Sequence, residues 1–155
     1  MTIGLVALAT AQAATAAPGA GARRAHEVVM PVAARKREFF ERYGFSEAVI
    51  DGDRVYLSGV VAGGGGVPKA AYERAFRMIA DILKRSGSSW DGVLEMTTYH
   101  TDLPGQIEGF TEVKNRYVRA PFPAWTAIDV DRLLPDNGLV EIKVVARRGR
   151  KAPRR

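Results

Sequence analysis

The sequence predicts an α+β domain in which one β-sheet carries two helices on one face. Two stretches place apolar residues at helical spacing, and six others are rich in β-branched and aromatic residues. Turn residues separate these segments and give the order β-β-β-α-β-α-β-β. Of the 155 residues, 46% are hydrophobic, which is enough to build the core of one such domain.

The first half of the chain predicts three strands. Residues 26–30 form a short strand that a proline ends. Residues 45–50 and 54–61 flank the sequence Asp-Gly-Asp at 51–53, which is typical of a hairpin turn. Between the first two strands, residues 33–42 predict one helical turn or an irregular loop.

Two helices follow a run of four glycines at 63–66, which lacks a phosphate-binding pattern and is interpreted as a connector. The first helix begins at Pro68, and Gly87 is its left-handed cap. The second covers residues 106–119, after a break at 103–105. The apolar stripe of the first helix consists of Tyr72, Phe76, Ile79 and Leu83.

Three further strands are expected at 93–101, 125–130 and 139–147. Apolar residues of the sheet outnumber those that two helices can cover, so we expect the sheet to pack against other subunits. The residues concerned are Val55, Leu57, Val93 and Ile142.

Composition excludes several kinds of catalytic site. The chain contains no cysteine, which rules out thiolate metal sites and a cysteine nucleophile. It contains two histidines, His26 and His100, too few for a three-histidine zinc site.

The net charge of +6 comes from the C-terminal residues 147–155. They hold six of the 23 basic residues, and the remaining 17 are balanced by 17 acidic residues. We interpret them as a basic disordered tail. The alternative is a tail that contacts RNA or another anionic surface, the one route by which nucleic acid is expected to bind.

The N-terminal residues 1–17 lack charged side chains and contain a short apolar run followed by small residues. This pattern favours a signal for export to the periplasm or for secretion over a disordered Ala-rich leader of a cytoplasmic protein. The run is too short to span a membrane. Residues 18–23 form a linker, and residues 24–146 form the folded domain.

Four segments, in this order and spacing, resemble the Rid superfamily, also called the YjgF or L-PSP group. They are FSEAVIDGDRVYLSG at 45–59, ILKRSGSSWDGVLEMTTYHTDL at 82–103, PAWTAIDV at 123–130 and LVEIKVVA at 139–146. The resemblance implies a chorismate-mutase-like fold and a homotrimer with ligand clefts between its subunits. It also implies hydrolysis of reactive enamines or imines, such as 2-aminoacrylate, so we expect no metal and no cofactor.

The resemblance assigns roles residue by residue. Glu141 corresponds to the glutamate that positions water, and Trp125 replaces the arginine that binds the substrate carboxylate. The other candidate ligand-binding residues are Phe45, Ser58, Gly59, Lys114 and Thr126. Trp125 either stacks on a ligand or packs in a subunit interface, and Glu141 either orients water or is a solvated or salt-bridged carboxylate. Lys114 is interpreted as a surface lysine in preference to a substitute cation.

Three functions remain open at this stage. The first is an enamine or imine hydrolase that works without the arginine on a small metabolite; the PAWTA segment resembles that of aminomuconate deaminases. The second is a non-catalytic trimer that binds a small ligand or a partner. The third is a ribonuclease, which the neutral charge of the domain disfavours.

Overall fold

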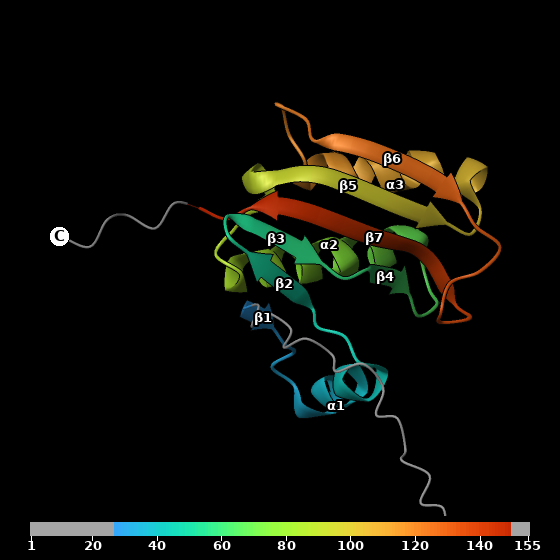
Figure 1. Cartoon of the computed structure of the whole chain (residues 1–155). Coiled ribbons are helices and arrows are strands. Elements are labelled where there is room, and N and C mark those ends of the chain that lie inside the picture. The colour runs from blue at the N-terminus through green and yellow to red at the C-terminus, as the bar shows by residue number, and fades with distance from the viewer. Residues whose placement is uncertain (1–26, 150–155) are drawn as a thin grey trace, which may run out of the picture.

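The computed structural model describes residues 27–149, and they form one seven-stranded sheet with three α-helices (Figure 1). The strands are β1 (Glu27–Val29), β2 (Ala48–Asp51), β3 (Arg54–Leu57), β4 (Val60–Gly63), β5 (Val93–His100), β6 (Ala124–Asp129) and β7 (Gly138–Arg147). The helices are α1 (Ala34–Tyr43), α2 (Pro68–Arg85) and α3 (Leu103–Tyr117). The predicted α+β class with a single sheet is confirmed.

The sheet runs in the order β1-β2-β3-β7-β5-β6, with β4 also paired to β7. Among the strands of residues 27–149, only β5 and β6 pair in parallel, and α3 makes the crossover between them. Helices α2 and α3 lie side by side on one face, as Figure 1 shows. Their apolar stripes build the core with that face of the sheet, and its largest buried side chains include Tyr72, Phe76 and Phe110.

Helix α1 corrects the prediction of one turn or a loop at 33–42. It lies outside the layer of α2 and α3 in Figure 1, although its Lys36 Nζ donates to Met78 Sδ of α2 at 3.6 Å, and none of its residues is buried. Because a helix without a buried stripe gives no apolar period, the sequence pattern missed it. It ends at Gly44, whose φ of 73° requires the left-handed region that glycine adopts without strain.

The predicted strand 54–61 is two strands, β3 and β4, on the same edge of β7. Tyr56 lies opposite Val145 and Val60 lies opposite Ile142, so three residues face two on β7. The extra residue is a β-bulge at Ser58 and Gly59.

The predicted helix 106–119 is also corrected. Helix α3 begins at Leu103, because Asp102 caps it by accepting a hydrogen bond from the Gly105 N–H at 3.2 Å.

The expectation of uncovered apolar residues on the sheet is wrong for the four named. Val55, Leu57, Val93 and Ile142 are all buried within the single chain. All four belong to the single core cluster that the sheet forms with the residues of α2 and α3. The opposite face of the sheet carries polar and larger side chains, among them Glu95, Thr97, Tyr99, Glu141 and Lys143.

The domain extends beyond the predicted boundary at Ala146. Arg147 pairs with Arg54 in the sheet. Arg148 donates two hydrogen bonds to the Glu27 carboxylate, at 2.8 and 2.9 Å, and its N–H donates to the Asp53 carbonyl. The first two basic residues of the predicted tail therefore belong to the fold.

The predictions for the leader, the linker and residues 150–155 lie outside the described residues. Among residues 27–149, no helix is both long and apolar enough to cross a membrane.

Candidate functional site

Glu141 lies at the centre of β7, with its carboxylate directly over Gly59. A Cβ atom at Gly59 would come within 1.7 Å of Glu141 Oε1. No side chain larger than hydrogen fits there while the carboxylate keeps its position. The bulge between β3 and β4 therefore creates the space that Glu141 occupies.

Ser58, the other residue of the bulge, has a structural hydrogen bond. Its hydroxyl donates to the Ser46 carbonyl at 2.6 Å, and its N–H donates to the Glu47 carbonyl at 3.0 Å. These bonds fix the bulge against the segment that precedes β2.

Two cavities meet at Glu141, Ser58 and Gly59. One has a volume of about 340 Å³ and extends between α1, α2 and the sheet, where Phe45 lines it. The other, of about 610 Å³, lies on the open face of the sheet beside Tyr99 and Lys143. Four of the seven predicted site residues are thus brought together, namely Phe45, Ser58, Gly59 and Glu141.

The Glu141 carboxylate is half-buried, and burial raises its pKa above the ordinary value, an effect that the positive charge of Lys143 opposes. In residues 27–149 no hydrogen bond or ion pair involves this carboxylate. Glu141 is therefore free to hold a water molecule and to exchange a proton with it.

Trp125 and Lys114 lie together, away from Glu141. They line a third cavity, of about 240 Å³, formed by α3, β5 and β6. The Trp125 indole N–H donates to Thr98 Oγ1 at 3.1 Å, and Lys114 Nζ lies 4.5 Å from the centre of the Trp125 ring.

The interpretation of Lys114 as a surface residue is wrong, since it is only 7% exposed. Burial lowers the pKa of its ammonium group, and Nζ donates to Asn115 Oδ1 at 2.9 Å. Thr126 lies on the opposite face of β6, level with Thr97 of β5, and is exposed. Within one chain, these three residues do not reach the Glu141 cavities.

Comparison with known proteins identifies the family to which this chain belongs. The profile of the family described as Endoribonuclease L-PSP matches residues 37–148. The chain is 32% identical over 120 residues to the RutC family protein YjgH of Escherichia coli (strain K12), covering 74% of this chain and 90% of that protein. The chain belongs to the L-PSP family, also called the YjgF or Rid family.

Solved structures of the Rid family share the fold. The structure of protein YJGH aligns with a TM-score of 0.70 at 27% identity, over 81% of this chain and 98% of that one. A Mycobacterium tuberculosis member of the YjgF/YER057c/UK114 family aligns with a TM-score of 0.70 at 26% identity, over 79% and 99%. RidA of Psychrobacter sp. PAMC 21119 aligns at 0.62 and 31% identity, over 67% and 88%.

Sequence reasoning missed the aromatic and charged residues that α1 adds to this Rid-family chain. Phe39, Phe40 and Lys36 line the 340 Å³ cavity together with Met78 of α2. The signal was present as four aromatic residues within 39–45, more than a solvated loop needs.

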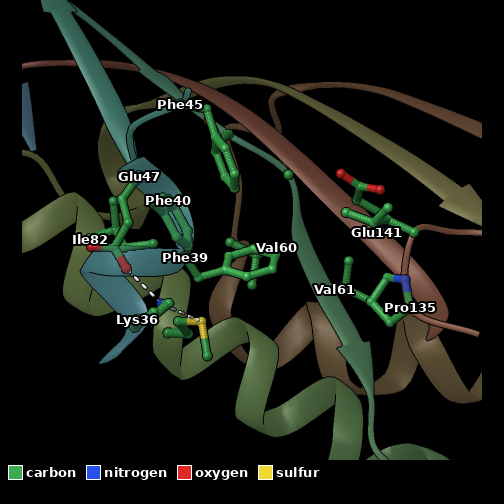
Figure 2. Close-up of a pocket in the computed structure, with 14 residues that line it drawn as sticks. Lys36, Phe39, Phe40, Phe45, Glu47, Val60, Val61, Ile82, Pro135 and Glu141 are labelled. Atoms are coloured by element: carbon green, nitrogen blue, oxygen red, sulfur yellow. Dashed lines mark hydrogen bonds and ion pairs between the residues drawn. The ribbon is translucent and has the colours of Figure 1, made fainter. Parts of the chain in front are cut away.

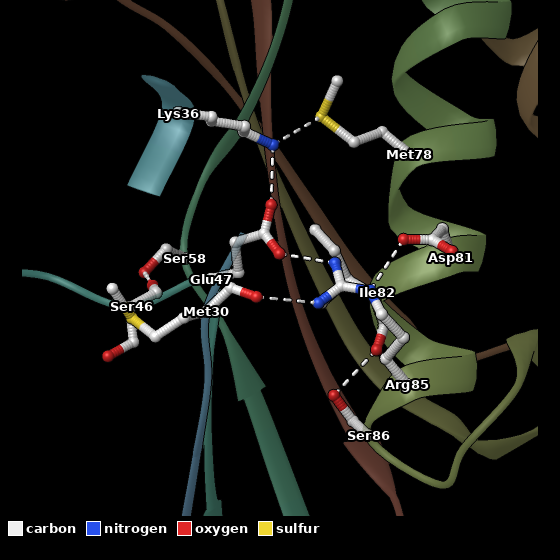
Figure 3. Close-up of polar contacts among 10 residues, drawn as sticks. All are labelled: Met30, Lys36, Ser46, Glu47, Ser58, Met78, Asp81, Ile82, Arg85 and Ser86. Carbon is white, nitrogen blue, oxygen red and sulfur yellow. Dashed lines mark hydrogen bonds and ion pairs between the residues drawn. The ribbon is translucent and has the colours of Figure 1, made fainter. Parts of the chain in front are cut away.

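Glu47, also missed, is the buried residue that holds α1 to the domain (Figure 3). It is 3% exposed, and its carboxylate accepts from Lys36 Nζ at 2.6 Å and from the Arg85 guanidinium. Arg85 also pairs with Asp81 at 2.8 Å and donates to the Met30 carbonyl at 3.1 Å. One carboxylate thus links α1, α2 and the segment before β2.

His100 has a structural role in the core. It is fully buried, with Nε2 3.0 Å from Thr98 Oγ1 and Nδ1 3.2 Å from Gln106 Oε1.

Arg132 is exposed and pairs with Asp136 at 2.7 Å. Within residues 27–149, no three histidine, aspartate or glutamate side chains are close enough together to hold a metal ion.

Proposed function

We propose that the protein is a hydrolase that adds water to the C=N bond of a small reactive imine, or of an enamine through its imine form, with Glu141 as the catalytic residue. One observation carries the proposal: the Glu141 carboxylate lies in a shared opening of two cavities, over a glycine, with no partner among the described residues. Membership of the Rid family supports the same chemistry.

The mechanism needs one proton acceptor that later acts as a donor. The ionised Glu141 takes a proton from water as the water oxygen bonds to the imine carbon, and the C=N electron pair moves to nitrogen, which receives that proton from Glu141. Glu141 then takes the proton of the carbinolamine hydroxyl and passes it to the amino nitrogen, so that a C=O bond forms as the C–N bond breaks and ammonia leaves. Imine and water thus give a carbonyl compound and ammonia. A carboxylate whose pKa is raised by burial suits both steps.

Trp125 supports a substrate different from 2-aminoacrylate. At the position of the family's arginine, Trp125 has a single N–H, which it donates to Thr98. It therefore cannot bind a carboxylate through two hydrogen bonds from a charged group, as an arginine does. We expect 2-aminoacrylate to be a poor substrate.

The proposed cleft is completed between subunits of a trimer. Strand β6 is an edge of the sheet, so its unpaired side is available to a second chain. The face around Glu141 also exposes apolar side chains, including Tyr56 and Ile128. A second subunit there would add the cavity lined by Trp125 and Lys114 to the opening beside Glu141.

Ammonia release from imines generated in situ by an amino-acid oxidase tests the proposal. The wild-type chain should accelerate release above the buffer rate, and Glu141→Gln should return the rate to that of buffer. Rates equal to buffer for a panel of imines of different size would reject the hydrolase and leave the ligand-binding trimer, which the unavailable Trp125 N–H also favours.

A further inference from the structure

The 340 Å³ cavity has an apolar end that the proposed chemistry at Glu141 does not use. Figure 2 shows Phe39, Phe40 and Phe45 on one side of the opening, with Glu141 and Pro135 on the other. Val60, Met78 and Ile82 complete the apolar end.

The three phenylalanine rings form a fixed wall. Phe40 stacks on Phe45 with ring centres 4.1 Å apart, and Phe39 meets Phe45 edge to face at 6.3 Å. The Phe45 N–H donates to the Phe40 carbonyl at 3.1 Å, directly after the left-handed turn at Gly44. The rings are therefore held in place before a ligand binds.

No charge at this end is free to bind a charged ligand group. The Lys36 ammonium group lies 2.6 Å from Glu47 Oε1, and the other Glu47 oxygen accepts from Arg85. The Ser58 hydroxyl donates to Ser46. Of the ionisable groups that line the cavity, Glu141 alone has no hydrogen bond or ion pair within residues 27–149, and it lies at the opposite end.

The volume fits an aromatic ring together with a reacting group. A cavity of roughly 150 Å³ is sufficient for benzene in a protein interior. The space of about 340 Å³ therefore holds a ring and leaves room for a C=N group and water beside Glu141.

We infer that the ligand of this site carries an uncharged aromatic or branched apolar substituent, which binds between α1 and α2 while its imine or carbonyl carbon lies at Glu141. The inference rests on the proposed function for the position of the reacting carbon. The binding of the apolar group does not depend on catalysis.

Equilibrium binding of carbonyl compounds, the products of the proposed reaction, tests the inference without turnover. Phenylacetone should bind the wild-type chain at least about tenfold more tightly than acetone, since the ring is transferred from water to an apolar site. A carboxylate at the para position of the ring should abolish this preference. Titration calorimetry with the full chain measures the three dissociation constants.

Substitutions inside and outside the cavity test where the apolar group binds. Phe39→Ala and Met78→Ala, on different helices, should each reduce the preference for phenylacetone by roughly fivefold. Val32→Ala removes an exposed apolar side chain beside α1 that does not line the cavity, and it should leave the preference unchanged. Circular dichroism checks that each variant is folded.

The outcomes separate this inference from the proposed function. Equal affinity for phenylacetone and acetone, or a preference that both cavity variants retain, overturns the inference even if imines are hydrolysed. A ring preference that the cavity variants lose, without hydrolysis of any imine, supports the inference and rejects the enzyme.

Discussion

At the residue scale, the site depends on Gly59, which has no side chain. Gly59 lies where the Glu141 carboxylate crosses the bulge between β3 and β4, and the φ of Gly59 is not in the left-handed region. Glycine is therefore required by the close approach of Glu141 and not by the backbone conformation. A methyl group at this position tests the site without changing any titratable group.

We expect Gly59→Ala to lower kcat/KM for imine hydrolysis by about 100-fold, because the carboxylate must move by an ångström or more. Gly109→Ala is the matched control. Its Cβ meets Lys69 Cε at an ordinary 3.6 Å, and alanine favours the helix by about 1 kcal/mol. Equal kinetics for both variants would show that the position of Glu141 does not matter.

The raised pKa of Glu141 predicts how stability depends on pH. Because the folded state favours the protonated acid, ionisation destabilises the fold as pH rises from the ordinary value of 4.5 through the raised pKa. Glu141→Gln removes this cost. Its Tm should exceed that of the wild type at neutral pH and match it below about pH 4, as measured by thermal denaturation across pH. A Tm difference independent of pH would contradict a desolvated carboxylate.

At the scale of elements, the sequence predicted helices and strands correctly where one buried face makes apolar residues recur at a regular spacing. Helices α2 and α3 and the strands β5 and β7 were found because one face of each is buried in the core. Helix α1 was missed because its aromatic side chains line a cavity and are not packed in a core. The break between β3 and β4 was missed because a bulge leaves the alternation of β-formers intact on either side.

The site was predictable to a similar extent. The resemblance to the Rid family assigned Phe45, Ser58, Gly59 and Glu141 to one site, and these four residues line one cavity. Spacing along the chain does not report which face of a strand a residue occupies. Trp125 and Thr126 therefore appeared as neighbours in one site, although they point to opposite faces of β6.

The attachment of α1 gives the prediction at this scale. Glu47→Gln should lower the free energy of unfolding by about 3 kcal/mol, because it leaves Lys36 and Arg85 without their shared buried carboxylate. Glu41→Gln, in the exposed pair with Arg37, should change it by less than about 1 kcal/mol. Urea denaturation measures both, and similar small losses would mean that Glu47 does not anchor α1.

At the scale of the whole molecule, the candidate residues form two groups, which line different cavities within one chain. Glu141 and Gly59 lie at one opening, while Trp125 and Lys114 line another cavity beside the edge strand β6. If each catalytic cleft takes one group from each of two subunits, the two groups can be supplied by different chains. Mixed trimers make this a measurable property.

If the Trp125 ring forms part of the wall of each cleft, Glu141→Gln and Trp125→Ala should each be inactive alone. Trimers assembled from an equal mixture should then recover about a quarter of wild-type activity, since about one interface in four pairs two intact halves. The mixture is refolded together, and light scattering checks that it is trimeric. Each variant mixed with wild-type chains controls for exchange. If both groups served a site within one chain, no pairing could restore it, and the mixture would stay inactive. A monomer by light scattering would equally reject a cleft between subunits.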